Sequence, residues 1–148
     1  MRLIRTGLDA DGRSLVIREE TLDPADARIQ LFNVPPGASS PPPGPGGALD
    51  LGVKPGEVSW LLRRLEPAYC YEMHHTDTVD LHLVLDGSAD LILDDGPHQL
   101  RPGDAVAITG IDHGWRVGPE GCTFAMMFVG TAPYRLPPYG LPAEGRPE

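Results

Sequence analysis

The histidines of this 148-residue chain are gathered in one stretch, and they are the residues best able to do chemistry. They are His74, His75, His82, His98 and His113. Imidazole nitrogens bind transition metals and transfer protons near neutral pH. The cluster therefore indicates metal or acid–base chemistry. His98 is the exception, since we interpret it as a surface or half-buried residue of a short strand.

A carboxylate joins this cluster in the segment MHHTDTVDLHLVLDG. Asp80 and His82 are two residues apart, so on a strand their side chains share one face, while Leu81 and Leu83 share the other. A strand with one wet face would bury the leucines and leave Asp80 and His82 in water. A strand buried on both faces would turn them into an internal cavity, where a carboxylate and an imidazole need a partner or a metal. The spacing is compatible with both arrangements.

The elements that position these residues are predicted to be strands. Short apolar or alternating segments are separated by Gly, Pro and Asp, at the spacing of about 8–12 residues typical of sandwiches and barrels. The candidate strands begin at Ser14, Arg28, Ala48, Glu57, Tyr69, Val79, Ala89, His98, Ala105, His113 and Cys122. We therefore expect an all-β barrel with little helix, and turns near Asp86 and Gly118 that separate neighbouring strands.

The length and the lack of an internal repeat predict a single domain over residues 1–148, with its barrel at about 48–132. Residues 34–47, VPPGASSPPPGPGG, cannot form a regular ladder because proline lacks the amide donor. We expect this Pro-rich loop to be a surface connection, or else a lid over a pocket. Residues 133–148 are expected to form a loosely packed C-terminal tail.

Composition excludes several classes of protein. The net charge of −9 provides no basic surface for nucleic acid or anionic lipid. No apolar run approaches the ~18–20 residues of a membrane span, and the first residues lack the apolar core of a signal peptide. Two cysteines, Cys70 and Cys122, make no disulfide framework. These features predict a cytoplasmic protein in which both thiols are reduced and packed.

The stretch from Leu61 to Phe128 resembles the cupins. Their first motif is G-x5-H-x-H-x3,4-E-x6-G, and here Asp80 takes the place of the Glu, with Gly87 seven residues later. His74 falls on the first His when the gap is three residues long, and another residue type replaces the second. With a gap of four residues, His75 falls on the second His and the first is replaced.

The second cupin motif is present in LRPGDAVAITGIDHGWRV. Its turn is RPGD, and His113 stands at the metal-binding His, although Val117 replaces the usual Asn. The resemblance implies a metal held by His74, His82 and His113, with His82 replacing the ligand lost from the first motif. His75 is a candidate fourth ligand. Asp80 is expected to bind the metal or to accept the proton of a ligand imidazole.

Imidazole ligands also limit the choice of metal. Three or four of them suit a divalent transition metal and argue against magnesium or calcium. We expect zinc first, with iron, nickel or manganese as alternatives. Apolar residues at inward strand positions are expected to line a pocket for an apolar or aromatic substrate. These substrate-binding candidates are Trp60, Tyr71, Met73, Trp115, Met126 and Phe128.

Among the cupins, the histidine-rich segment is similar to the cyclases of aromatic polyketide biosynthesis, of the resistomycin type. That resemblance implies a metal-dependent homodimer that closes a poly-β-ketone by intramolecular aldol condensation and dehydration. The substrate would be free or delivered by an acyl carrier protein, and Asp80 and His75 would be its acid–base residues. Two rivals use the same residues: an Fe(II) cupin dioxygenase or decarboxylase, and a non-enzymatic module that binds a small molecule.

Overall fold

The computed structural model describes residues 1–136, and this part of the chain is built from strands. They are β1 (Arg2–Leu8), β2 (Ser14–Thr21), β3 (Gly47–Ala48), β4 (Val58–Leu65), β5 (Cys70–His75), β6 (Thr78–Leu93), β7 (Gly96–Leu100), β8 (Ala105–Ile108) and β9 (His113–Gly130). No helix occurs in residues 1–136, so none there could cross a membrane. The predicted all-β fold is confirmed.

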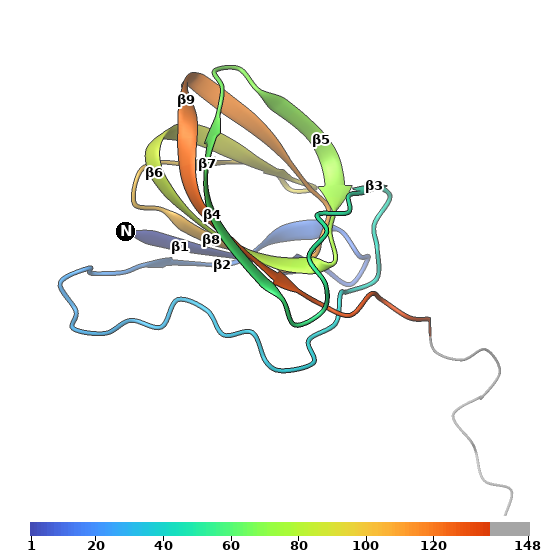
Figure 1. The fold of residues 1–148 in the computed structure, drawn as a ribbon. Helices are drawn as coiled ribbons and strands as arrows, with labels where there is room; N and C mark the ends of the chain where they lie inside the picture. The colour runs from blue at the N-terminus through green and yellow to red at the C-terminus, as the bar shows by residue number, and fades with distance from the viewer. Residues whose placement is uncertain (137–148) are drawn as a thin grey trace, which may run out of the picture.

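The strands form one sheet that curls around on itself (Figure 1). Their order is β2-β1-β8-β6-β9-β5-β3, with β4 beside β9 and β7 beside β6. The pairs β1–β8 and β3–β5 are parallel and the others are antiparallel. The first half of β6 pairs with the last part of β9, and the second half of β6 pairs with the first part of β9. These two long strands therefore belong to both halves of the curled sheet.

The continuity of β6 and β9 corrects the predicted turns. Near Asp86 the chain bends at bulges between Val84 and Asp86 and between Gly87 and Ala89, without reversing. At Gly87 φ is 75°, and a Cβ there would lie 2.0 Å from the carbonyl oxygen of Gly121. Only glycine fits this crossing of the two strands, so the glycine-rich segments that look like turns are the corners of continuous strands.

Two other strand predictions are wrong. The segment from Arg28 forms no ladder; it runs extended over the sheet, where the Phe32 ring lies 5.6 Å from the Arg5 guanidinium of β1. Strand β1 was not predicted, because Leu3 and Ile4 are both buried and give no alternation.

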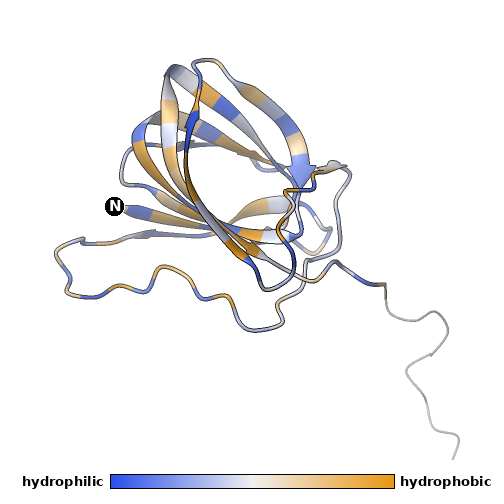
Figure 2. Cartoon of the chain, in the orientation of Figure 1, coloured by the Kyte–Doolittle hydropathy of each residue, from blue (hydrophilic) through white to orange (hydrophobic). Residues whose placement is uncertain are grey.

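The core lies inside the curl of the sheet. It includes Leu91 from β6, Leu100 from β7, Ile108 from β8 and Phe124 from β9, all fully buried. Hydrophobic and hydrophilic residues alternate along the strands, as Figure 2 shows. Because side chains alternate between faces, one face of each strand packs inward, and each large apolar residue so buried contributes about 1.5–3 kcal/mol relative to exposure.

The outer face of β4 is apolar and exposed. Val58, Trp60 and Leu62 are 59%, 76% and 72% exposed. Trp60 lies opposite Met127 of β9, which lies opposite Leu81 of β6, so an apolar row crosses three strands. Trp60 was expected to line the substrate pocket, and the structure corrects this: alternation turns it outward.

The Pro-rich loop, residues 34–47, runs along the surface and is fixed at two points. The backbone N–H of Ser40 donates to Ala132 O at 2.8 Å, and that of Gly46 donates to the carboxylate of Asp112 at 2.8 Å. Of the predicted tail, residues 137–148 lie outside the described residues. The thiol prediction holds for Cys122, which is buried with its pKa raised to about 11 by that burial, but Cys70 is exposed.

Candidate functional site

A cavity of about 250 Å³ within the curled sheet brings together four of the predicted site residues. His74 comes from β5, Asp80 and His82 from β6, and His113 from β9; each is at most 8% exposed. Asp80 and His82 therefore face an internal cavity, as in the second of the two arrangements that their spacing allowed, although the opposite face of the strand, with Leu81 and Leu83, is only half-buried. The curl of the sheet supplies the third and fourth groups from neighbouring strands.

Backbone carbonyls fix the protonation of two of these histidines. Nδ1 of His74 lies 2.9 Å from Glu72 O, and Nδ1 of His113 lies 2.9 Å from Ile111 O. Because a carbonyl oxygen can only accept, each Nδ1 carries the proton and each Nε2 keeps its lone pair. This is the arrangement by which proteins orient imidazoles that bind metals.

Asp80 faces the imidazoles with one oxygen and a hydroxyl with the other. Its Oδ2 lies 3.9 Å from Nε2 of His82 and 4.0 Å from Nε2 of His113. Its Oδ1 accepts a hydrogen bond from Thr78, whose hydroxyl is bonded to that of Thr76 at 2.7 Å. These threonines were not predicted as site residues, although Thr78 is two residues and Thr76 four residues before Asp80, a spacing that places all three on one face.

Burial governs the charges in the cavity. It raises the pKa of Asp80 to about 7, against the opposing effect of the Thr78 hydrogen bond. It lowers the pKa of His82 to about 4, and the positive charge of Arg63 adds to that lowering. It also lowers the pKa of His113 to about 3, with a contribution from His74, whose own pKa is lowered by burial as well. The imidazoles are therefore neutral at neutral pH, as ligands must be.

The donor types in the cavity fit a divalent transition metal. Three neutral imidazoles and a carboxylate are ligands of zinc and iron, and the buried Nδ1 of His82 lacks a hydrogen-bond partner within the described residues. As the side chains stand in residues 1–136, however, no group of three or more is arranged to hold an ion. Ligand atoms on a tetrahedral zinc are about 3.3 Å apart. The distances from Oδ2 of Asp80 to Nε2 of His82 and of His113, 3.9 and 4.0 Å, are longer than this, so these groups would have to move closer together to share an ion.

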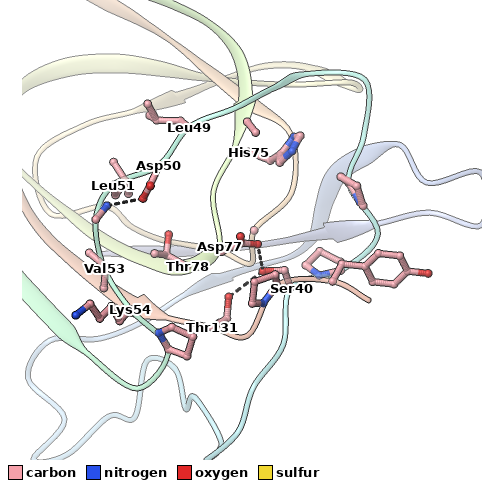
Figure 3. A pocket seen from close by; sticks show the side chains of 18 residues that line it. Ser40, Leu49, Asp50, Leu51, Val53, Lys54, His75, Asp77, Thr78 and Thr131 are labelled. Carbon is pink, nitrogen blue, oxygen red and sulfur yellow. Dashed lines mark hydrogen bonds between the residues drawn. The ribbon is translucent and has the colours of Figure 1, made fainter. Parts of the chain in front are cut away.

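His75 lies outside this cavity, on the wall of a second one of about 650 Å³ (Figure 3). Its Nδ1 donates to Oδ1 of Asp112 at 2.7 Å. Asp112 is held in turn by the Gly44–Gly46 segment, where a Cβ at Gly44 would lie 2.2 Å from the carboxylate. Because consecutive residues of a strand point to opposite faces, β5 does not bring both His74 and His75 to one point. The structure does not place His75 as a fourth ligand.

Some, but not all, of the apolar residues predicted to bind substrate line the cavity. Tyr71, Trp115, Met126 and Phe128 line the cavity, whereas Met73 lines another hollow beside Asp112. Aromatic rings surround His82, with ring centroids 5.3 Å away at Phe128 and 6.0 Å away at Trp115. His98, expected to be an ordinary residue, bonds Asp95 at 2.6 Å.

Six lining residues were not predicted as site residues, among them Leu65 and Thr76. Leu49 and Leu51 line the cavity from the segment after the Pro-rich loop, whereas Ser40, Pro41 and Pro43 of the loop itself line the second cavity. Tyr69 and Arg63 complete the wall. Arg63 could have been found from the sequence, because its spacing from Leu65 places it on the inner face of β4.

Comparison with known proteins gives partial likenesses. No protein-family model matches the chain. Two curated relatives are Phomopsin biosynthesis cluster proteins C′ and D of Diaporthe leptostromiformis, each 35% identical, over 102 and 96 residues. The matches take in 67% and 61% of this chain, but 46% and 44% of the relatives. The chain thus spans less than half the length of the curated relatives it matches.

Among solved structures, the chain is similar to the polyketide cyclase RemF from Streptomyces resistomycificus. The identity is 27%, the match covers 48% of this chain and 53% of that one, and the TM-score is 0.45. An RmlC-like cupin from Shewanella frigidimarina is 18% identical over 51% of this chain and 68% of that one, with a TM-score of 0.46. Both likenesses are partial, with TM-scores below 0.5, so the site stands on its own geometry.

Proposed function

We propose that this chain is a metal-dependent polyketide cyclase, which closes a poly-β-ketone by intramolecular aldol condensation and dehydration. One observation carries the proposal: imidazoles with their Nε2 lone pairs free meet a carboxylate of raised pKa in a cavity with aromatic walls. His74, His82 and His113 would hold the metal, with zinc first and iron, nickel or manganese as alternatives. When bound, a divalent metal polarises a carbonyl oxygen and acidifies the adjacent C–H.

The residues of the chain supply the rest of the chemistry. Trp115, Met126 and Phe128 form a wall that folds a flexible chain and brings two of its carbons together, which lowers the entropy cost of ring closure. Asp80 lies beside the imidazoles, where its Oδ2 can take a proton from a carbon next to a carbonyl. The buried position of Asp80 excludes bulk water from that proton transfer.

The names of the similar proteins are compatible with this proposal. RemF is a polyketide cyclase, and the two curated relatives are named for a biosynthesis cluster. A role in small-molecule biosynthesis agrees with both. The reaction itself rests on the site, because these likenesses cover about half of this chain or of the similar protein.

The direct test is a cyclisation assay. A poly-β-ketone is generated in the same tube by a minimal polyketide synthase with its acyl carrier protein, and the products are separated by mass spectrometry. We expect one cyclised product with the protein, and the mixture of spontaneous products without it or after treatment with a chelator. The same yield without oxygen would separate a cyclase from a dioxygenase. An unchanged product mixture would contradict the proposal.

We also propose that a second copy of the chain covers the apolar face of β4. Trp60 and Leu62 are exposed there beside Met127, and association would remove them from water. Light scattering is expected to give about twice the chain mass of 15.9 kDa. The double variant Trp60→Ser/Leu62→Ser is expected to be monomeric, whereas Ile17→Ser, a change at an exposed apolar residue of β2, is expected to stay dimeric. A monomeric parent protein at micromolar concentration would refute the dimer.

A further inference from the structure

Arg63 brings a permanent positive charge to the mouth of the histidine cavity. It lies on β4, exposed at its tip, and lines the cavity together with Leu65 of the same face. Its charge is near enough to the interior to add to the lowering of the His82 pKa that burial causes. The imidazoles are neutral, so the guanidinium is the fixed cation that a molecule entering the cavity meets.

The guanidinium of Arg63 makes no stabilising polar contact with the described part of the chain. Within residues 1–136 Arg63 takes part in no ion pair or side-chain hydrogen bond, whereas its neighbour Arg64 donates to Glu120 O at 2.9 Å and to Thr123 Oγ1 at 3.3 Å. The acidic group on the cavity wall is Asp80, which is buried beyond the imidazoles and bonded to Thr78. The five N–H donors of Arg63 are therefore available to an anion from solution.

The walls select the shape of that anion. Tyr69 and Tyr71 are stacked with an interplanar angle of 27°, and the Tyr71 ring meets His74 edge-on at 4.6 Å. Trp115 and Phe128 continue this lining. A volume of about 250 Å³ is below the usual range of about 300–1,000 Å³ for drug-sized ligands, so it admits one or two rings. Flat walls favour a flat ligand over a branched aliphatic one.

We propose that the cavity binds a small planar, conjugated oxyanion, and that Arg63 selects for its negative charge. A carboxylate or the enolate of a β-diketone meets this description, with two oxygens in one plane matched to the guanidinium fork. The assignment goes beyond the proposed function, because it concerns the charge of the ligand. It would hold equally for a protein that binds such a molecule without transforming it.

The test uses benzoate and benzamide, which have the same shape and differ in charge. A Trp60→Phe background leaves Trp115, on the cavity wall, as the one tryptophan of the chain, so its fluorescence reports occupancy. We expect benzoate to bind about tenfold more tightly than benzamide. In Arg63→Gln the ratio of the two dissociation constants is expected to fall to about one, by loss of the charge-assisted hydrogen bonds. Arg64→Gln, whose side chain points to the opposite face, should keep the preference.

Repeating the titrations on metal-free protein separates this inference from the proposed function. A preference for benzoate that survives the chelator and is lost in Arg63→Gln supports Arg63, whatever the protein catalyses. A preference that is lost with the metal and kept in Arg63→Gln assigns the anion to the metal and overturns the inference. Absence of benzoate binding to the parent protein also overturns it. Thermal unfolding of each variant checks the fold, and Arg63→Gln should leave it unchanged because Arg63 is exposed and makes no ion pair or side-chain hydrogen bond within residues 1–136.

Discussion

Replacing His113 by alanine is expected to remove the metal from the protein and to abolish cyclisation. His113 is fully buried, its Nδ1 is committed to Ile111 O, and its Nε2 lies 4.0 Å from Asp80. Loss of this imidazole leaves a buried opening that no neighbouring donor can fill. Because even a residue that only orients a ligand is worth about 10–100-fold in metal affinity, loss of the ligand itself should exceed that range. Metal content per chain, measured by plasma mass spectrometry, checks the expectation.

Two sets of control variants distinguish loss of a metal ligand from unfolding and from the loss of any histidine. His113→Gln retains more of the side-chain volume, so an unfolded alanine variant cannot be mistaken for one that has lost only its metal. His98→Ala and His75→Ala should retain the metal, because these histidines are bonded to Asp95 and Asp112 outside the cavity. Equal metal content in the parent protein and in both His113 variants would refute the metal site. Loss of the metal from His75→Ala would show that His75 is a ligand after all.

Much of the fold is contained in the local sequence. The predicted starts of β2, β4, β5 and β8 lie within one residue of those observed, because period-two burial and turn residues are local signals. The joining of predicted strands into β6 and β9 is not local. Whether Gly87 reverses the chain or only bends it depends on Gly121, which lies more than thirty residues away in sequence and leaves no room for a side chain.

In the candidate site, too, local spacing could be predicted from the sequence and contacts between distant residues could not. The sequence pairs Asp80 with His82 through their spacing, and the cupin resemblance adds His74 and His113; the structure brings all four together. No motif indicated the partner of His75, because Asp112 reaches it from the connection between β8 and β9. Strand parity decides such cases: His75 faces away from His74 as Trp60 faces away from the cavity, and neither fact requires knowledge of a family.

Replacing Asp80 by asparagine is expected to lower the cyclisation rate by about 10²–10⁴-fold, the usual contribution of a general base. The amide oxygen of asparagine can still accept the hydrogen bond from Thr78, so fold and metal content should be retained. What the variant loses is a group able to take a proton beside His82 and His113. Single-turnover cyclisation rates, together with metal content, measure the two effects separately. Asp77→Asn, the same change at a residue bonded to Ser40 in the second cavity, is the control and should leave both unchanged.

The cyclisation rate and the metal content of Asp80→Asn together assign a role to Asp80. Activity lost with full metal content makes Asp80 the base, or the group that orients a ligand imidazole. Activity and metal lost together make it a ligand, for which its Oδ2 is already the oxygen nearest to two imidazole nitrogens. If metal and turnover both persist, Asp80 has no part in the reaction. A base other than Asp80 would then have to take the proton, supplied either by the metal or by a histidine that is not a ligand, and His75 would be the next residue to replace.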